Sequence, residues 1–249
     1  MDTRPLIAIF VLGVGLTSWC WGSSSDDVEG ADPRAREKAI DTGLLSKPVA
    51  DVDTRGMTML EAVVEIGRKS GTCFGVVLTK RSIAVDKAPA IRTANTPLGS
   101  LLSKLLGTNR GLEVAERVGC VVIRPVGEEP KYLGTIIPLF QIPSEPLDIA
   151  SAALDQALSA TREKPQAHQG AWGTASSISA NADSPVVGPL TIKSQSVEAI
   201  LSTLAASARS TMWVANPAQS SQPWTFIRYG ESTETTRSKL ARVLASLSE

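Results

Sequence analysis

The sequence predicts an α+β protein of two small β-α-β-β domains in tandem, with a long mobile loop in the second and an amphipathic C-terminal helix. Short apolar strands alternate with segments whose apolar residues recur every three or four positions, which indicates mixed strands and helices. The apolar pattern around Leu102 returns around Leu201, at an offset of 99 residues (201 − 102), which indicates a repeated unit. The 249 residues are 43% hydrophobic, enough for a buried core in one or two domains.

Residues 1–22 have the pattern of a secretory signal peptide. An apolar run over 6–16 is followed by the small residues Cys20 and Gly22 and then by a polar stretch, so we expect cleavage before Ser23. The run is shorter than the ~20 residues of a spanning helix, which favours cleavage over a retained anchor. After cleavage the mature protein would be periplasmic or otherwise exported, with no membrane span. The alternatives are a retained membrane anchor and lipidation at Cys20, which the bulky residue before it disfavours.

Residues 23–48 are polar and charged, so we expect a flexible leader before a first domain over 49–126. Thr58 and Glu61 have the spacing of a capping box, which predicts a helix that ends at Gly71. Thr96-Pro97 predicts an N-cap and first position for a second helix. The other expected elements are strands over 49–52, 73–78 and 90–92, and a hairpin of 111–115 and 120–124 closed around Gly119.

The second domain is expected over 132–229. Its first strand contains Pro138, which favours an edge position. Residues 162–189 are rich in Ala, Ser, Gly and Gln without periodicity, so we expect a mobile loop there. The expected elements are strands over 134–140, 188–192, 211–214 and 224–228, helices over 144–161 and 196–208, and a final helix within 232–249.

The two domains share a sequence pattern that is typical of duplication. At the offset of 99 residues, the second helix of each domain carries the same apolar stripe, and the strands on either side keep their spacing. The identical pairs are Leu102 and Leu201, Ser103 and Ser202, Leu105 and Leu204, and Arg110 and Arg209.

The charge balance and the residue counts exclude several functional classes. Lys plus Arg and Asp plus Glu both number 25, and this zero net charge argues against a protein that coats nucleic acid through a basic surface. After cleavage one His and two widely spaced Cys would remain, fewer than the four N or S ligands of the usual zinc sites, and no glycine-rich phosphate loop precedes a helix. We therefore expect no metal, no cofactor and no nucleic-acid partner.

After cleavage Cys73 and Cys120 would be the remaining cysteines. An exported protein with one such pair is a candidate for a disulfide. The alternative is two free thiols packed as small apolar residues in strands.

No residue pattern indicates a catalytic group. His168 lies in the Ala/Gln-rich loop without the packing and the carboxylate that a catalytic triad needs. Thr161 and Lys164 match the spacing of a nucleophile–lysine pair, but Thr161 ends a helix instead of beginning one. Of the tryptophans, Trp213 and Trp224 lie in expected strands and are predicted core residues, whereas Trp172 lies in the loop and is a candidate for partner contact.

Three segments of the first domain follow one known pattern: 56–63 (GMTMLEAV), 96–109 (TPLGSLLSKLLGTN) and 120–125 (CVVIRP). In this pattern the domain resembles the short N-terminal domain (STN) of secretins and TonB-dependent receptors. The resemblance covers 49–125 and, less closely, 186–229. It implies protein–protein contact in the bacterial periplasm without catalysis. Because the residues after Pro125 depart from that family, its channel and receptor functions do not transfer.

The sequence therefore predicts an exported, non-enzymatic protein–protein interaction module of the cell envelope, associated with a secretion or receptor assembly. The alternatives are a small periplasmic ligand-binding protein and a Ser-dependent hydrolase. The C-terminal helix has an apolar stripe that must be buried, either on the second domain's own sheet or in a groove of a partner. The stripe consists of Leu240, Val243, Leu244 and Leu247. Together with Trp172, these residues are the candidates for partner contact.

Overall fold

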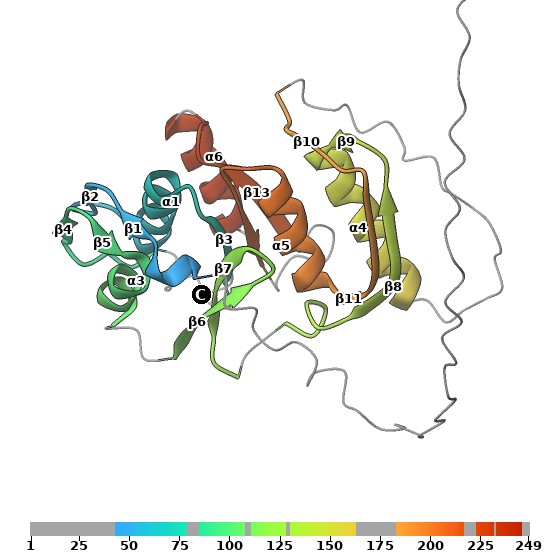
Figure 1. The fold of residues 1–249 in the computed structure, drawn as a ribbon, viewed down its shortest axis with the longest axis horizontal. Helices are drawn as coiled ribbons and strands as arrows, with labels where there is room; N and C mark the ends of the chain where they lie inside the picture. Colours follow the sequence, from blue (N-terminus) through green and yellow to red (C-terminus); the bar gives the residue numbers. More distant parts are fainter. Residues whose placement is uncertain are drawn as a thin grey trace, which may run out of the picture. The chain divides into compact units, whose positions relative to one another are not determined.

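A five-stranded sheet in the order β13-β12-β3-β7-β6 lies at the centre of the fold (Figure 1). The middle strands β12, β3 and β7 run parallel, and the outer strands β13 and β6 are antiparallel to their neighbours. The computed structural model describes residues 43–78, 85–107, 111–127, 130–162, 183–216, 223–231 and 233–245. The strands of this sheet are β3 (Cys73–Val77), β6 (Leu112–Arg117), β7 (Cys120–Pro125), β12 (Thr211–Ala215) and β13 (Trp224–Arg228).

Four short antiparallel ladders and several helices surround the sheet, so the protein has the mixed α and β structure that was predicted. The ladders are β1 (Pro48–Val49) with β5 (Thr96–Pro97), β2 (Val52–Asp53) with β4 (Arg92–Thr93), β8 (Ile136–Ile142) with β11 (Leu190–Ser196), and β9 (Glu145–Pro146) with β10 (Val186–Val187). The helices are η2 (Leu44–Ser46), α1 (Met59–Ser70), α3 (Leu98–Leu106), α4 (Leu147–Arg162), α5 (Val197–Ser207) and α6 (Thr233–Ala245).

The start of α1 confirms the predicted capping box. The Thr58 hydroxyl accepts from the Glu61 amide at 3.3 Å, and the Glu61 carboxylate accepts from the Thr58 amide at 2.9 Å. Gly71 ends the helix at a φ of 61°, a left-handed conformation that glycine adopts without strain.

The start of α3 differs from the prediction. Thr96 belongs to β5, and Pro97 is the N-cap instead of the first helical residue, without a side-chain capping bond. The reason is a backbone partner, since the Leu98 amide donates to the Lys47 carbonyl beside β1 at 2.9 Å. A neighbouring strand thus satisfies an amide that a capping side chain would otherwise serve.

Other element boundaries shift by a few residues. The expected strand over 49–52 divides into β1 and β2, and the expected helix over 144–161 begins only at Leu147 because 145–146 pair with β10. Pro138 lies in β8, whose one strand partner in the described part of the chain is β11, as an edge position requires. The predicted signal peptide, the predicted leader up to residue 42, and residues 163–182 of the predicted loop lie outside the described residues.

The two predicted domains contribute to one sheet, because β3 pairs in parallel with β12. The contact is close at Gly75, where a Cβ would lie 2.3 Å from the Trp213 indole. On one side of this junction the nearly buried Glu198 carboxylate of α5 lies 3.3 Å from the Arg124 guanidinium and 3.7 Å from that of Arg117. Packing and buried charge therefore join the two parts of the sequence.

The two faces of the sheet belong to two separate apolar clusters. Phe74, Val121 and Ile227 pack on one face, together with residues of α1, α3 and α6. The fully buried Trp213 and its neighbour Trp224 pack on the opposite face, with residues of α4 and α5. The prediction that both tryptophans are core residues is confirmed.

Cys73 and Cys120 form a disulfide between the parallel neighbours β3 and β7. They are directly paired in the ladder, with their Cα atoms 4.5 Å apart. The predicted pairing is confirmed, and the alternative of two free thiols is wrong.

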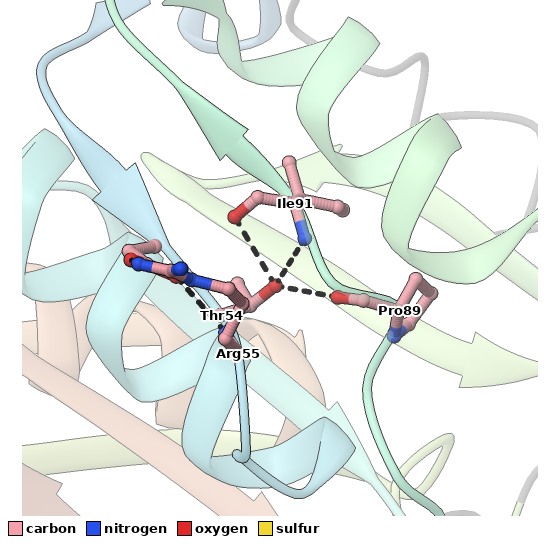
Figure 2. Close-up of polar contacts among 5 residues, drawn as sticks. Thr54, Arg55, Pro89 and Ile91 are labelled. Carbon is pink, nitrogen blue, oxygen red and sulfur yellow. Dashed lines mark hydrogen bonds and ion pairs between the residues drawn. The ribbon is translucent and has the colours of Figure 1, made fainter.

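A buried hydroxyl links the ladder of β2 and β4 to the turn before β4 (Figure 2). The Thr54 side chain is fully buried, and its hydroxyl donates to the Pro89 carbonyl at 2.6 Å and accepts from the Ile91 amide at 2.9 Å. Next to it, the exposed Arg55 guanidinium forms an ion pair with Asp53.

Candidate functional site

Strand β13 lies at one end of the central sheet, and its outer edge, called the free edge below, pairs with no other strand in the described part of the chain. Its register with β12 pairs Thr211 with Arg228, and the flanking Tyr229 amide donates to the Ser210 carbonyl at 2.8 Å. In an antiparallel pair, alternate residues direct their amide and carbonyl groups toward the partner strand. The groups of Trp224, Phe226 and Arg228 therefore point away from β12, toward a side where no described strand lies.

This free edge borders a groove with a volume of about 880 Å³. Residues of α4 form one wall and residues of α6 form the other, and residues of β13 line the groove between them. The groove is lined from α4 by Leu147, Asp148, Ser151, Ala152, Asp155 and Gln156, from β13 by Trp224, Thr225, Phe226 and Arg228, and from α6 by Thr235, Lys239 and Arg242; Asp183, Ser184, Pro185, Gly230 and Glu231 complete it.

The Trp224 end of the groove is held by polar and aromatic contacts. The indole Nε1 donates to the Ser151 hydroxyl of α4 at 3.0 Å. The Tyr132 ring lies 6.1 Å from the Trp224 ring, and its hydroxyl donates to the Pro223 carbonyl at 2.9 Å. These contacts fix α4 against the start of β13, so the groove is formed before any ligand binds.

The two walls of the groove carry opposite charges. Asp148 and Asp155 lie on α4, whereas Lys239 and Arg242 lie on α6. Lys239 also pairs with Glu231, and the Arg228 guanidinium donates to the Asp183 carbonyl. A ligand in the groove would therefore meet an acidic wall on one side and a basic wall on the other.

The opposite edge of the sheet, β6, is more covered. The Leu45 amide of η2 donates to the nearly buried Glu116 carboxylate of this strand at 2.8 Å. A smaller groove of about 570 Å³ remains between β6 and α3, lined by apolar side chains that include Leu102, Leu106 and Val114. The β13 groove is therefore the stronger candidate for binding.

Among the predicted partner-contact residues, the structure describes the side chains of Leu240 and Val243, and these two lie in one apolar cluster. Leu240 and Val243 are 4% and 2% exposed and pack in the cluster with Ile227. Trp172, Leu247 and His168 lie outside the described residues, and the Leu244 side chain is not among those described. The Thr161 hydroxyl donates to the Leu158 carbonyl at 2.7 Å, within its own helix.

Sequence reasoning located β13 but missed its role. Residues 224–228 were predicted as a strand, yet nothing in their pattern indicates which edge stays unpaired. The hairpin joins the sheet through β12, which pairs with the distant β3, and β13 therefore stands at the end of the strand order. From the sequence, the charged residues of α4 and α6 could be predicted only to lie on the polar faces of two amphipathic helices. The sequence does not indicate that these faces line one groove.

In the described part of the chain, no three His, Cys, Asp or Glu side chains gather as metal ligands. No helix there is long and apolar enough to cross a membrane. No family model, curated protein or solved structure matches the chain.

Proposed function

We propose that this protein is an exported, non-enzymatic interaction module of the bacterial cell envelope, and that it binds a segment of another envelope protein in the groove beside β13. The observation that carries the proposal is the free edge of β13 inside a preformed groove. Unpaired backbone groups at a strand edge bind other chains without any catalytic residue. The STN-like sequence pattern favours an interaction protein with two such domains in tandem. The signal-peptide pattern favours its export to the cell envelope.

A second candidate is a small-ligand-binding protein. The groove volume of about 880 Å³ falls in the range of known ligand sites, roughly 300–1,000 Å³. Such sites usually enclose their ligand among apolar side chains. The two walls of opposite charge fit a polar peptide segment better than an apolar small molecule.

A photo-cross-linking experiment tests the first proposal. A photoreactive residue at Gln156, an exposed position of the groove wall on α4, is expected to cross-link to an envelope protein in intact cells. The matched control places the same residue at Lys193, which is equally exposed on β11 but does not line the groove. Reversing the opposite wall with Lys239→Glu should reduce the cross-link from Gln156.

Equal cross-linking from both positions, or none from Gln156, would reject the groove as the contact surface. If the groove instead binds a small ligand, no protein adduct forms, and the native protein loses thermal stability after exhaustive dialysis. The same cells test the location, because a mature N-terminus at Ser23 in the periplasmic fraction is expected from mass spectrometry.

A further inference from the structure

The strand pairing is repeated in the two parts of the chain. In the first, β1 pairs with β5 and β2 with β4; in the second, β8 pairs with β11 and β9 with β10, in the same sequence order. Each set of ladders is accompanied by two helices and a hairpin: α1, α3 and β6-β7 in the first part, α4, α5 and β12-β13 in the second.

Hydrogen bonds at the helix starts match in the same way. The first amide of α1, Met59, donates to the Asp86 carbonyl, and the first amide of α4, Leu147, donates to the Pro185 carbonyl, both at 2.8 Å. The first amide of α3 donates to Lys47 at 2.9 Å, and that of α5, Val197, donates to Thr135 at 3.1 Å. The two parts are therefore equivalent in backbone detail as well as in element order.

The two parts differ in one strand: β3 of the first part has no counterpart among the described strands of the second. In the first part β3 lies parallel to β7, with Phe74 opposite Val121 and Val76 opposite Ile123. The hairpins correspond through their registers, since Leu112 pairs with Pro125 as Thr211 pairs with Arg228. Strand β13 is thus the counterpart of β7, and its free edge is the place that β3 fills in the first part.

We propose that the segment bound in the groove is an extended strand of the partner protein, added to β13 in the parallel direction as β3 is added to β7. This inference rests on the proposed function and specifies the form of its partner. The correspondence with β3 places successive residues of the added strand opposite Trp224, Thr225 and Phe226. The outward amide and carbonyl groups of β13 supply its hydrogen bonds.

The walls specify the side chains of this strand. Neighbouring residues in a sheet point to the same face, and successive residues to opposite faces. The partner residue opposite Thr225 therefore points toward α6, where Arg242, beside the Lys239–Glu231 ion pair, favours an acidic side chain. The residues on either side of it point toward α4, where Asp148 and Asp155 favour basic or small side chains.

The competing occupant is the chain itself. Trp172-Gly173 follows α4 in the sequence as Phe74-Gly75 follows α1. However, residues 165–182 contain no Asp, Glu, Lys or Arg, so they cannot complement either charged wall. Charge complementarity therefore favours a partner strand.

The test uses the full chain and a phage-displayed library of random peptides. Selected peptides are expected to alternate acidic residues with basic or small ones, and to bind Phe226→Pro at least about tenfold more weakly than Phe226→Ala, a difference of about 1.4 kcal/mol. Both variants lose the ring, but only proline removes the outward amide and blocks an added strand. Because this amide does not bond to β12, the fold should survive, which circular dichroism checks.

Direction and occupancy are read by nuclear magnetic resonance. A spin label on the peptide N-terminus should broaden the Trp224 amide more than the Arg228 amide, and the Phe226 amide should exchange slowly only in the complex. The reverse broadening pattern would overturn the parallel direction, and slow exchange in the isolated protein would show that the chain itself pairs this edge. Equal peptide binding by the two Phe226 variants, or no selected peptide, would reject strand addition; groove cross-links from Gln156 would then still support the proposed function.

Discussion

At the residue scale, buried polar side chains specify how local segments pack. Thr54 is the clearest case, because its hydroxyl both donates and accepts inside the protein and has no access to water. A buried donor or acceptor that loses its partner costs roughly 1–3 kcal/mol. The sequence gives no sign of this role, because Thr54 stands in a polar stretch that reads as a turn.

We expect Thr54→Val to lower the free energy of unfolding by about 1–3 kcal/mol. Valine keeps the shape of threonine but leaves the Ile91 amide without its acceptor. Urea denaturation followed by circular dichroism measures the change. Thr191→Val is the control, because Thr191 is exposed on β11 and the same substitution there should change the stability little; equal effects at both positions would contradict the role of the Thr54 hydroxyl.

At the element scale, the start of α1 links a charge to helix stability. The Thr58 amide, which donates to the Glu61 carboxylate, holds the pKa of that carboxyl below its ordinary value of 4.5. A group with a depressed folded-state pKa stabilises the protein above its unfolded pKa and loses that contribution as the pH falls through the folded pKa. The contribution of Glu61 should therefore be complete at neutral pH and disappear in acid.

The corresponding experiment compares wild type with Glu61→Gln in urea at several pH values. We expect the wild type to be more stable at neutral pH, and the difference to shrink as the pH falls below about 4.5. Glu65→Gln is the control, since Glu65 lies in the same helix outside the capping box. A difference that stays constant with pH would show that the carboxylate charge does not act at this cap.

Helix α6 stabilises the protein only if its apolar side packs against the central sheet. Leu240 is 4% exposed against the central sheet, and the Asn216 side chain donates to the Val243 carbonyl at 3.3 Å. Truncating a buried leucine to alanine typically costs 2–5 kcal/mol. Leu240→Ala is therefore expected to lower the melting temperature of the isolated protein, whereas Ser238→Ala, an exposed change in the same helix, should not.

An unchanged melting temperature for Leu240→Ala would mean that α6 does not rest on the sheet in solution. Its apolar stripe would then be available to a partner, which is the other role that the sequence leaves open. The melting temperature of Leu240→Ala therefore distinguishes packing on the sheet from availability to a partner.

At the scale of the whole molecule, the disulfide and the β3–β12 junction join distant parts of the chain. The bond between Cys73 and Cys120 spans 47 residues and connects the two parallel strands at the middle of the sheet. A loop of this length restricts the unfolded chain by about 4 kcal/mol in the chain-entropy description. Its effect should reach both parts of the fold, because β3 also pairs with β12.

Cys73→Ala combined with Cys120→Ala is expected to lower the free energy of unfolding by up to about 4 kcal/mol, measured in urea without reductant. Wild type with reductant should approach the double variant, and the double variant should not respond to reductant. If tryptophan fluorescence, which reports on Trp213 and Trp224, did not shift with circular dichroism, the two parts would not unfold as one unit.

Local sequence determined most of the individual elements. The capping box of Thr58 and Glu61, the turn at Gly119 and the strand at 224–228 were all predictable, because each depends on residues adjacent in the chain. The predicted N-cap of α3 was wrong for the complementary reason, since the Leu98 amide donates to the carbonyl of Lys47, which lies 51 residues earlier in the chain (98 − 47). Interactions at long range override local preference when they satisfy the same backbone group.

The sequence by itself determined the order of strands and helices, the repeated apolar stripe and the existence of one cysteine pair, because these follow from periodicity and counting. Only the tertiary structure decided that β3 pairs with β12, and therefore that the two parts share one sheet. The tertiary structure also decided that β13 stands at the end of the strand order and that charged residues of α4 and α6 line the groove beside it. Strand pairing depends on which edges meet in space, and alternation along one strand carries no information about its neighbour.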